Sequence, residues 1–375
     1  MKEWKKVKFL DYIELNPKVL INKGEICPFI EMANVDCNMR QPRSFEYKPF
    51  TSGVKFLTYD TVIARIEPCL QNGKGFLFTK QGVGFGSTEY LVFRAKPSKT
   101  IPLFVYYFMR THKIKTLMCN SMSGATGRQR VNNDVFLNLE VDIPYYDEQQ
   151  RIATILSRYD SLIENYQKQI KLLEESAQRL YKEWFIDLRF PGHENTKIVD
   201  GIPEGWEKKN LGDITPIKTG KRDANFGTAD GEYPFFTCAQ EPIKSPAYSF
   251  DTSAVILAGN GDFNVKLYRG KFEAYQRTYV LEPNDTNMLY LLFFCVLENM
   301  NRLATGASGS TIKFLTKGMI ESLDLYEPDV DTLFAFNKIV EPIQRQKENL
   351  STQIRHLTEA RDRLLPKLMS GEIEV

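Results

Sequence analysis

The chain has 375 residues, 42% of them hydrophobic and 26% charged, which is the composition of a globular protein with room for two domains of ordinary size. No stretch approaches ~20 uninterrupted apolar residues, and the polar start lacks the apolar core of a signal peptide. We therefore expect a cytoplasmic protein without a membrane span. The six cysteines form no CxxC pair and only three histidines are present, which argues against a zinc site and favours reduced, buried thiols.

The formal net charge of +2 conceals an uneven distribution of charged residues. Residues 1–147 contain 21 Lys and Arg against 14 Asp and Glu, a net charge of +7, whereas residues 198–328 contain 13 against 17, a net charge of −4. A basic excess is expected of a protein that binds a polyanion such as DNA. Only the first segment has this excess, so net charge does not explain how the second segment would bind DNA.

Short strands are predicted in both halves of the chain, because runs rich in β-branched and aromatic residues alternate with Gly and Asn turns. These runs lie at residues 54–59, 61–66 and 89–94, and again at 254–258 and 278–282. The Gly-Val-Gly-Phe-Gly run at residues 82–86 is interpreted as a flexible turn between strands. One helix is predicted at residues 102–118 and another at 287–303, each just before a glycine patch.

The second half of the chain repeats the first. Residues 4–11 resemble residues 206–213, with a Trp and an Asp seven residues apart in both segments. The glycine patch Ser-Gly-Ala-Thr-Gly at 123–127 likewise matches Thr-Gly-Ala-Ser-Gly at 305–309. Each patch leads to a Pro that follows a strand-like run, at Pro144 and at Pro328. The common order of these matches predicts two copies of one structural unit.

After each Pro the sequence predicts a long helix with the a/d spacing of a coiled coil. In the first copy the apolar positions step by four and three without a break: Ile152, Leu156, Tyr159, Ile163, Tyr166, Ile170, Leu173, Ala177, Leu180 and Trp184. Adding 184 to each number gives the second series: Phe336, Val340, Ile343, Lys347, Leu350, Ile354, Leu357, Arg361, Leu364 and Leu368. Pro342 predicts that the second helix starts late or is kinked, and Pro366 that it is kinked or ends there.

These patterns predict an α+β fold with two mixed α/β domains related by a pseudo-twofold axis. The two helices would form an antiparallel coiled-coil strut between the domains, because helix one leaves the first domain and helix two leaves the second. The predicted boundaries are residues 1–147 for the first domain, 148–190 for the central helix, 191–328 for the second domain and 329–375 for the C-terminal helix.

No motif for catalysis is found in the sequence. A Walker A loop is absent, as are an Asn/Asp-Pro-Pro-aromatic methylation motif, a glycine-rich cofactor loop that opens a βαβ unit, and a carboxylate cluster of a metal nuclease. The three histidines are far apart in the sequence. We therefore expect no catalytic residue, no metal ligand and no cofactor.

Binding residues are instead expected in loops and at strand ends, where Arg, Lys, Gln and Asn can reach base edges and phosphates. In the first copy they are Arg65, Gln71, Asn72, Lys74, Arg128, Gln129 and Arg130. In the second copy they are Lys218, Lys221, Arg222, Asn260, Thr311 and Lys313. Taken alone, each loop is better explained as a solvated turn, and it is the recurrence of polar glycine patches in both copies that favours binding.

Five strings together resemble the specificity subunit of type I restriction–modification systems. Residues 202–213 are similar to the opening of a target-recognition domain in that family, and residues 180–192 to the exit from its central helix. Residues 365–373 resemble its C-terminal end, and residues 86–94 and 124–130 resemble strings inside its recognition domains. The resemblance covers essentially the whole chain, although the acidic second domain and the charged Lys347 and Arg361 in the second helix depart from a simple pattern.

The resemblance implies a non-catalytic DNA-recognition subunit, each recognition domain reading one half of a bipartite, asymmetric double-stranded site. It also implies that the helices hold two methyltransferase subunits, which recruit restriction/translocase subunits. The assembled complex would be a site-specific adenine methyltransferase and ATP-dependent endonuclease, with SAM, ATP and Mg belonging to the partners. The helix residues expected to form the seam or meet a partner are Ile152, Leu156, Ile163, Ile170, Leu173, Leu180, Trp184, Ile343, Leu350, Ile354, Leu357 and Leu364.

Two other functions remain open at this point. One is a single-chain DNA-modifying enzyme with an unrecognised active site, which would bind SAM by itself. The other is a coiled-coil assembly adaptor that does not touch DNA.

Overall fold

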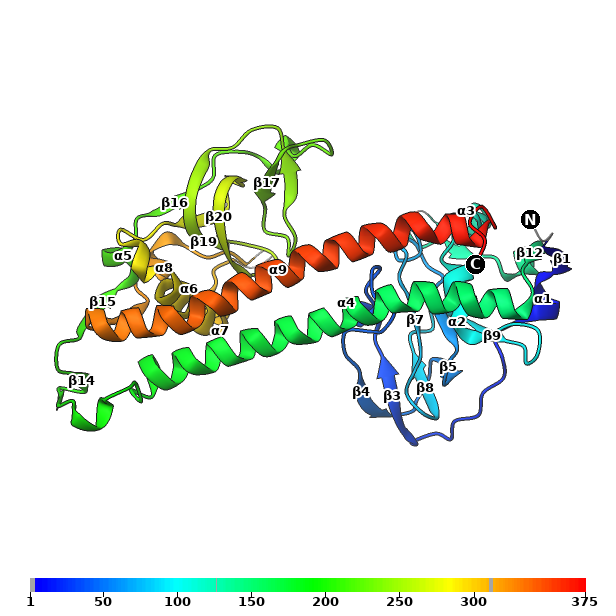
Figure 1. Ribbon diagram of the computed structural model, residues 1–375, viewed down its shortest axis with the longest axis horizontal. Coiled ribbons are helices and arrows are strands. Elements are labelled where there is room, and N and C mark those ends of the chain that lie inside the picture. Colours follow the sequence, from blue (N-terminus) through cyan, green and yellow to red (C-terminus); the bar gives the residue numbers. More distant parts are fainter. Residues whose placement is uncertain (1–3, 126, 310–312) are drawn as a thin grey trace. The chain divides into compact units, whose positions relative to one another are not determined.

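The computed structural model describes residues 4–125, 127–309 and 313–375. The chain forms two compact units: unit 1 comprises residues 1–169 and 350–375, and unit 2 comprises residues 170–349. Each unit consists of a mixed α/β body and of parts of two long helices, α4 (Tyr146–Tyr181) and α9 (Val330–Met369). Figure 1 shows these two helices and the strands of each body.

The body of unit 1 contains two four-stranded sheets. The first is antiparallel and has the order β2 (Ile13–Leu15), β9 (Tyr90–Ala95), β6 (Thr61–Ala64), β7 (Gly75–Leu77). The second has the order β4 (Glu46–Pro49), β3 (Ile26–Ile30), β8 (Val83–Gly86), β5 (Val54–Leu57), with β3 and β8 parallel. Two short helices follow, α2 (Pro102–Met109) and α3 (His112–Asn120), and then the hairpin β10 (Met122–Ser123) and β11 (Arg130–Val131).

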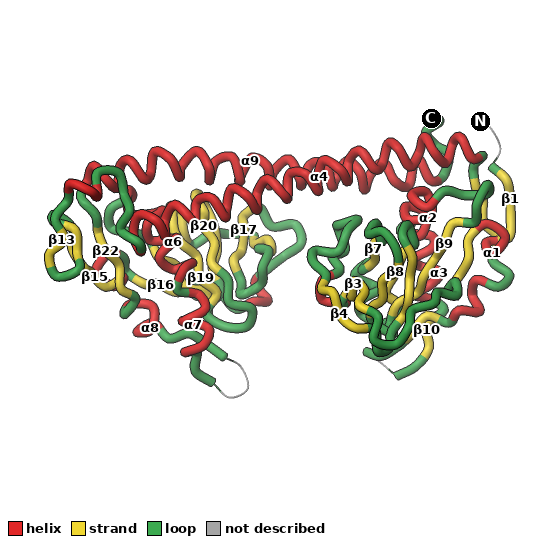
Figure 2. The backbone as a smooth tube through the Cα atoms, turned by 90° about the horizontal axis from the view of Figure 1, so that it is seen from below, coloured by secondary structure: helices red, strands yellow, loops and turns green. Residues whose placement is uncertain are grey.

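The body of unit 2 contains one six-stranded sheet. Its order is β16 (Ile217–Thr219), β21 (Thr278–Leu281), β19 (Phe250–Ala258), β20 (Val265–Ala274), β17 (Tyr233–Phe236), β18 (Ile243–Ser245), with β17 and β20 parallel. The helices are α6 (Leu289–Glu298), α7 (Met300–Gly306) and α8 (Lys317–Glu321), and a small hairpin joins β13 (Ile198–Val199) to β14 (Ile202–Pro203). The helices α2 and α6 lie between the strands and the long helices of their own units (Figure 2).

The internal repeat predicted from the sequence is present in the structure. The opening strand of each copy pairs antiparallel with the strand that leads into a long helix. These pairs are β1 (Lys5–Lys8) with β12 (Glu140–Ile143), and β15 (Glu207–Asn210) with β22 (Asp324–Glu327). A four-residue helix follows each opening strand: α1 (Phe9–Tyr12) and α5 (Leu211–Ile214). The prediction of two copies of one mixed α/β unit is therefore confirmed.

The two copies differ where the strands are broken. In unit 2 the ladder between β19 and β20 is continuous, whereas in unit 1 Tyr59 interrupts the corresponding stretch between β5 and β6 with a φ of 70°. The next residue, Asp60, is buried, accepts a hydrogen bond from the Leu57 backbone (2.7 Å) and pairs with Arg94. Because these contacts replace ladder hydrogen bonds, unit 1 has two sheets in place of one.

The long helices run antiparallel in both units, as predicted. In unit 1 Asp160 of α4 pairs with Arg361 of α9, and the earlier Ile152 shares a buried cluster with the later Leu368. In unit 2 Glu174 pairs with Lys347 at 2.9 Å. A larger number on α4 thus meets a smaller number on α9, which defines the antiparallel direction.

The late start that was one expected effect of Pro342 is not observed: α9 begins at Val330, because Asp329 accepts a hydrogen bond from the Thr332 backbone (2.9 Å) and caps the first turn. The end that was one expected effect of Pro366 is not observed either, since α9 continues to Met369. A kink, the other alternative at each Pro, stays a prediction. The single helices predicted at 102–118 and 287–303 are each two helices, divided at residues 110–111 and at residue 299.

Residues 82–86 are not a flexible turn, because Val83–Gly86 form the strand β8. Glycine is needed there because a Cβ on Gly84 would lie 2.7 Å from the rings of Phe56 and Phe78. The expectation of buried thiols holds only for Cys27 and Cys295, while the other four cysteines are partly exposed. Among the described residues, no helix is long and apolar enough to cross a membrane.

Candidate nucleic-acid interface

In unit 1 two of the predicted binding motifs meet beyond the end of β6. Ile66 forms a β-bridge with Arg130, and the Glu67 backbone N–H donates to the Gln129 carbonyl at 3.0 Å. The loop after β6 and the glycine patch before β11 are therefore neighbours, although about 60 residues of chain separate them. This contact places Arg65, Arg128 and Arg130 at one edge of the body.

The corresponding motifs of unit 2 meet in the same way. Asn260, just after β19, forms a β-bridge with Phe314, and the Leu315 N–H donates to the Gly259 carbonyl at 2.8 Å. Lys313 is exposed beside this bridge. Thr311, also a predicted binding residue, lies outside the described residues. Because Asn260 sits on a bridge, its backbone is fixed by the sheet and is not part of a free loop.

Strand register shows that the two meeting points are equivalent. Ala64 at the end of β6 lies opposite Tyr90 of β9, and Ala258 at the end of β19 lies opposite Thr278 of β21. Both candidate sites therefore occupy the carboxyl end of the same strand in each copy. Repetition of one position in two divergent bodies is the main structural reason to treat it as a site.

The remaining predicted residues of unit 2 lie at the same sheet edge. Thr219 at the end of β16 lies opposite Tyr279 of β21, so Lys221 and Arg222 follow directly beyond that edge. The Gln276 N–H donates to the Arg222 carbonyl at 2.9 Å. The structure thus brings the two predicted basic loops of this copy together.

The basic residues of unit 1 differ in how available they are. Arg65 is half-buried and donates from Nη2 to the Val131 carbonyl at 3.0 Å, so it holds the glycine patch in place. Arg130 makes a two-pronged contact with Glu89, whose pKa is lowered by this hydrogen bond. Arg128 is exposed, and within residues 4–125, 127–309 and 313–375, which the structure describes, it has no side-chain partner. Of these three arginines, Arg128 is therefore the most available to a ligand.

Three further predicted residues of unit 1 belong to the loop between β6 and β7. Gln71 is exposed and donates to Glu67 at 2.9 Å, and Asn72 is exposed beside it. Lys74 is half-buried and donates from Nζ to the Met32 carbonyl at 3.0 Å. Asn72 and Lys74 also line a pocket that is partly open to solvent.

In unit 2 the loops at the sheet edge are basic, although the segment that contains them has a negative net charge. Lys221 and Lys313 are exposed, and the described part of the chain offers neither an acidic partner. Lys218 pairs with Glu282 at 2.8 Å, and this contact lowers the pKa of that carboxyl. Arg222 stacks over Phe226 with a distance of 4.3 Å, while its Nε lies 3.7 Å from the buried carboxylate of Glu273. The edge therefore remains positive although the whole segment is acidic.

Two further cations at these edges were not predicted from the sequence. Lys18 is exposed after β2 and lines a shallow groove with Arg65. Arg277 is exposed before β21, where its backbone carbonyl accepts a hydrogen bond from Gly259 (2.9 Å). Register equates the position of Arg277 with that of Glu89 in unit 1, so an alignment of the two copies at these strands would have drawn attention to Arg277.

The described residues contain no group of three or more His, Cys, Asp or Glu side chains that could hold a metal ion. Burial raises the pKa of Tyr106 and of Cys295 to about 12, which makes these groups less reactive. Exposed cations and amides around a rigid strand end are suited to contacting phosphates and base edges.

The twelve predicted seam residues are all buried or half-buried. The buried ones are Ile152, Leu156, Ile163, Trp184 and Leu350. The half-buried ones are Ile170, Leu173, Leu180, Ile343, Ile354, Leu357 and Leu364. Trp184 lies in a π-helical turn (Lys182–Ile186) just beyond α4, and its ring packs 5.9 Å from that of Phe336 on α9.

Comparisons with known proteins give a consistent result. The family model described as the type I restriction modification DNA specificity domain matches residues 1–175 and 203–355. The EcoDI specificity subunit of Escherichia coli is 40% identical over 178 residues, which are 46% of this chain and 39% of that protein. The MjaIX specificity subunit of Methanocaldococcus jannaschii is 29% identical over 301 residues, 72% of this chain and 69% of that protein.

A solved structure shares the fold. The crystal structure of a type I restriction–modification S subunit from M. genitalium superimposes with a TM-score of 0.60 at 18% sequence identity. The match covers 97% of this chain and 96% of the other.

Proposed function

Because the chain belongs to the DNA specificity family of type I restriction–modification systems, as a sequence-recognition subunit without catalysis of its own, we propose that its two units read the two halves of a bipartite, asymmetric DNA site. The observation that carries this proposal is the repeated meeting of two polar loops at the carboxyl ends of β6 and β19. Two equivalent positions in two divergent bodies suit two different half-sites.

Different side chains at the two edges support different readouts. In unit 1 the position before β9 is Glu89, held by Arg130, whereas in unit 2 the equivalent position is Arg277, which is exposed. A Glu accepts hydrogen bonds from cytosine, whereas an Arg donates to guanine in the major groove. Lys221 and Lys313 would contact phosphates and orient unit 2, although the segment as a whole is acidic.

The proposed domains are residues 1–147 and 191–328, and the proposed helical segments are 148–190 and 329–375. The helices would dock two methyltransferase subunits, which would recruit restriction subunits. Apolar side chains exposed on the helices support such a role, because exposed apolar patches often mark surfaces that bind another protein. On α4 they include Leu162 and Leu172, and on α9 Val330, Phe334 and Ile339. SAM, ATP and Mg would be bound by the partners, in the cytoplasm, where the DNA lies.

The test is reconstitution with the methyltransferase subunits of the same system. We expect a mobility shift on DNA carrying the methylated sequence of the host, and base methylation by the complex that the isolated chain cannot perform. Binding of SAM by the isolated chain would favour a DNA-modifying enzyme. If the methyltransferase subunits bind DNA with the same affinity in the presence and in the absence of this chain, the result would favour an assembly adaptor.

A further inference from the structure

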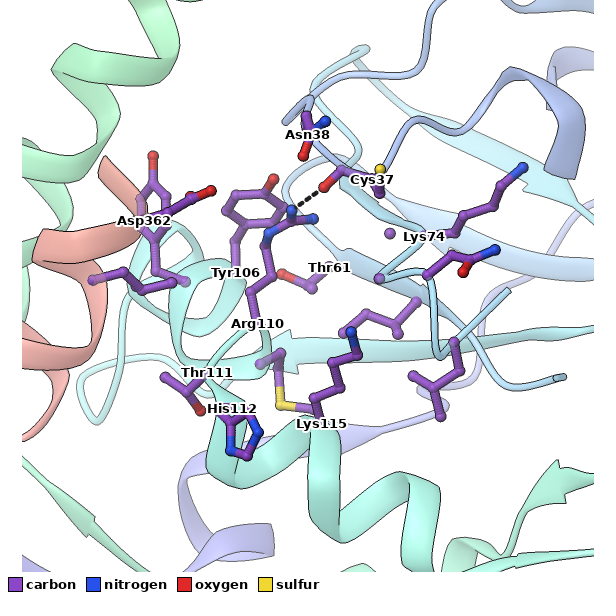
Figure 3. Close-up of a pocket in the computed structure, with 18 of the residues that line it drawn as sticks. Cys37, Asn38, Thr61, Lys74, Tyr106, Arg110, Thr111, His112, Lys115 and Asp362 are labelled. Carbon is purple, nitrogen blue, oxygen red and sulfur yellow. Dashed lines mark hydrogen bonds between the residues drawn. The ribbon is translucent and has the colours of Figure 1, made fainter. Parts of the chain in front are cut away.

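Unit 1 contains a cavity of about 400 Å³ between its α/β body and its parts of the long helices (Figure 3). One wall is formed by Thr61 of β6 and the loop before β7, and a second by the corner between α2 and α3. The third wall is formed by Asp160 of α4 and by residues 361–366 of α9. The volume lies in the range of small-molecule sites, ~300–1,000 Å³.

The walls of the cavity carry an excess of positive charge. Four cationic side chains line it, Lys74, Arg110, Lys115 and Arg361, against the two carboxylates Asp160 and Asp362. Arg361 satisfies both carboxylates, with contacts of 2.7 and 2.8 Å. Within the described residues the other three cations, Lys74, Arg110 and Lys115, have no carboxylate partner. Lys74 donates to the Met32 carbonyl and Arg110 to the Cys37 carbonyl.

Two buried polar atoms at the cavity lack a hydrogen-bond partner in the described part of the chain. They are the hydroxyl of Thr61, a residue only 1% exposed, and Nη1 of Arg110. Figure 3 shows the side chains of Thr61 and Arg110 beside one another, with Lys115 nearby on α3. Buried donors of this kind are disfavoured unless an acceptor satisfies them, and here every unsatisfied group can donate.

Part of the remaining lining is apolar. This part consists of Ile63, Leu70, Met109, Met118 and Leu365, together with the ring of Tyr106, while Asn38, Asn72, Thr111 and His112 add polar groups. A bare inorganic anion would leave this surface without contacts. An organic body of one or two rings would cover it, as in most small-molecule sites.

We propose that this cavity binds a small organic phosphate of about the size of a nucleoside monophosphate. Arg110, Lys115 and the Thr61 hydroxyl hold the phosphate, since charge-assisted hydrogen bonds from Arg and Lys are the strong ones for this group. The apolar wall holds the organic body. Because the walls come from the body, α4 and α9, the bound ligand stabilises the packing of these elements within unit 1.

The experiment is isothermal titration of the full chain with AMP, GMP and ribose 5-phosphate, and with adenosine as the uncharged control. We expect at least one phosphate to bind and adenosine to bind about tenfold more weakly or not at all. Lys115→Gln and Thr61→Val should each weaken the phosphate by about tenfold. Lys113→Gln is the matched control, because Lys113 lies on the same helix, exposed and 3.8 Å from Asp142, and it should leave the affinity unchanged.

Thr61→Val also distinguishes a ligand site from a folding effect. The hydroxyl has no partner in the described part of the chain, so its removal should leave the thermal midpoint of the free chain unchanged or raise it, while binding is lost. The proposal is overturned if none of the three phosphates binds, if adenosine binds as well as AMP, or if Lys113→Gln weakens binding as much as Lys115→Gln. DNA recognition by the reconstituted complex is measured separately, so its failure and the failure of this site are distinguishable.

Discussion

Asp160 on α4 and Arg361 on α9 form a buried ion pair inside unit 1, with the carboxylate Oδ1 and the guanidinium Nη1 2.7 Å apart. The hydroxyl of Tyr107 donates to the other carboxylate oxygen at 2.5 Å, so both oxygens of the buried Asp160 carboxylate accept a hydrogen bond. In the repeat, the positions equivalent to this pair are Gln344 and Ala177. The pair is therefore present in one copy of the repeat only. A buried polar contact of this kind can specify the register of two paired helices.

Arg361→Met should destabilise unit 1 by about 3–5 kcal/mol, because it leaves the carboxylate of Asp160 buried without its counter-ion. The double variant Asp160→Leu/Arg361→Met should recover most of this loss, since a well-packed apolar pair avoids the desolvation of both charges. The measurement is denaturant unfolding read by hydrogen exchange in peptides of unit 1. Lys347→Met is the control, because its partner Glu174 is largely exposed, and it should cost no more than ~1 kcal/mol.

The salt dependence of DNA binding should separate free cations from structural ones. Alanine at Arg128, Lys221 or Lys313 should each reduce the slope of log K against log salt by about one, if the residue contacts a phosphate. Alanine at Lys74 should leave the slope unchanged, because this side chain donates to the Met32 carbonyl. Equal slope changes for Lys74 and Arg128 would contradict the placement of the interface at the strand ends.

Exchange of residues 1–147 for the corresponding domain of another family member should change one half of the recognised site and leave the other half unaltered. The reason is that each copy of the repeat contains a complete strand-end site. Genome-wide mapping of methylated positions in a host carrying the hybrid is the measurement. Altered bases in both halves would show that the two units do not read DNA independently.

Asp329→Ala should destabilise unit 2 by about 1 kcal/mol, because the carboxylate caps α9 and accepts a hydrogen bond from Trp206 Nε1 at 3.1 Å. Burial raises the pKa of Asp329, but the hydrogen bonds from Thr332 and Trp206 outweigh it, so the pKa lies below the ordinary value. The stabilisation is therefore complete above the ordinary pKa of a carboxyl and is lost as the pH falls through the lowered one.

Thermal unfolding between neutral and acidic pH checks this prediction. The difference between wild type and Asp329→Ala should shrink as the pH falls. Asp331→Ala is the matched control: it removes a carboxylate from the same first turn, where the helix dipole favours a negative charge, and should cost less than Asp329→Ala at neutral pH. A difference that stays constant down to acidic pH would show that the carboxylate charge of Asp329 contributes nothing.

The candidate site was only partly predictable from the sequence. The polar loops around Arg65, Arg128 and Asn260 were found because they recur in both copies, and the structure places them at equivalent strand ends. The direction of each side chain was not predictable. Arg65 and Lys74 are in the predicted loop, yet both donate to backbone carbonyls of distant segments. Arg277 was missed because the sequence around it carries no motif.

The sequence by itself determined the repeat, the mixed α/β class and the antiparallel helices, because these follow from local residue patterns and from the order in which the segments follow one another along the chain. The 4–3 spacing of Ile152, Leu156 and their successors is readable without knowing what they pack against. Only the tertiary structure decided which loops meet, which cations remain free and where the cavity beside Arg110 lies. These depend on contacts between segments far apart in the chain, such as Ile66 with Arg130 and Asp160 with Arg361, and no local pattern encodes such pairings.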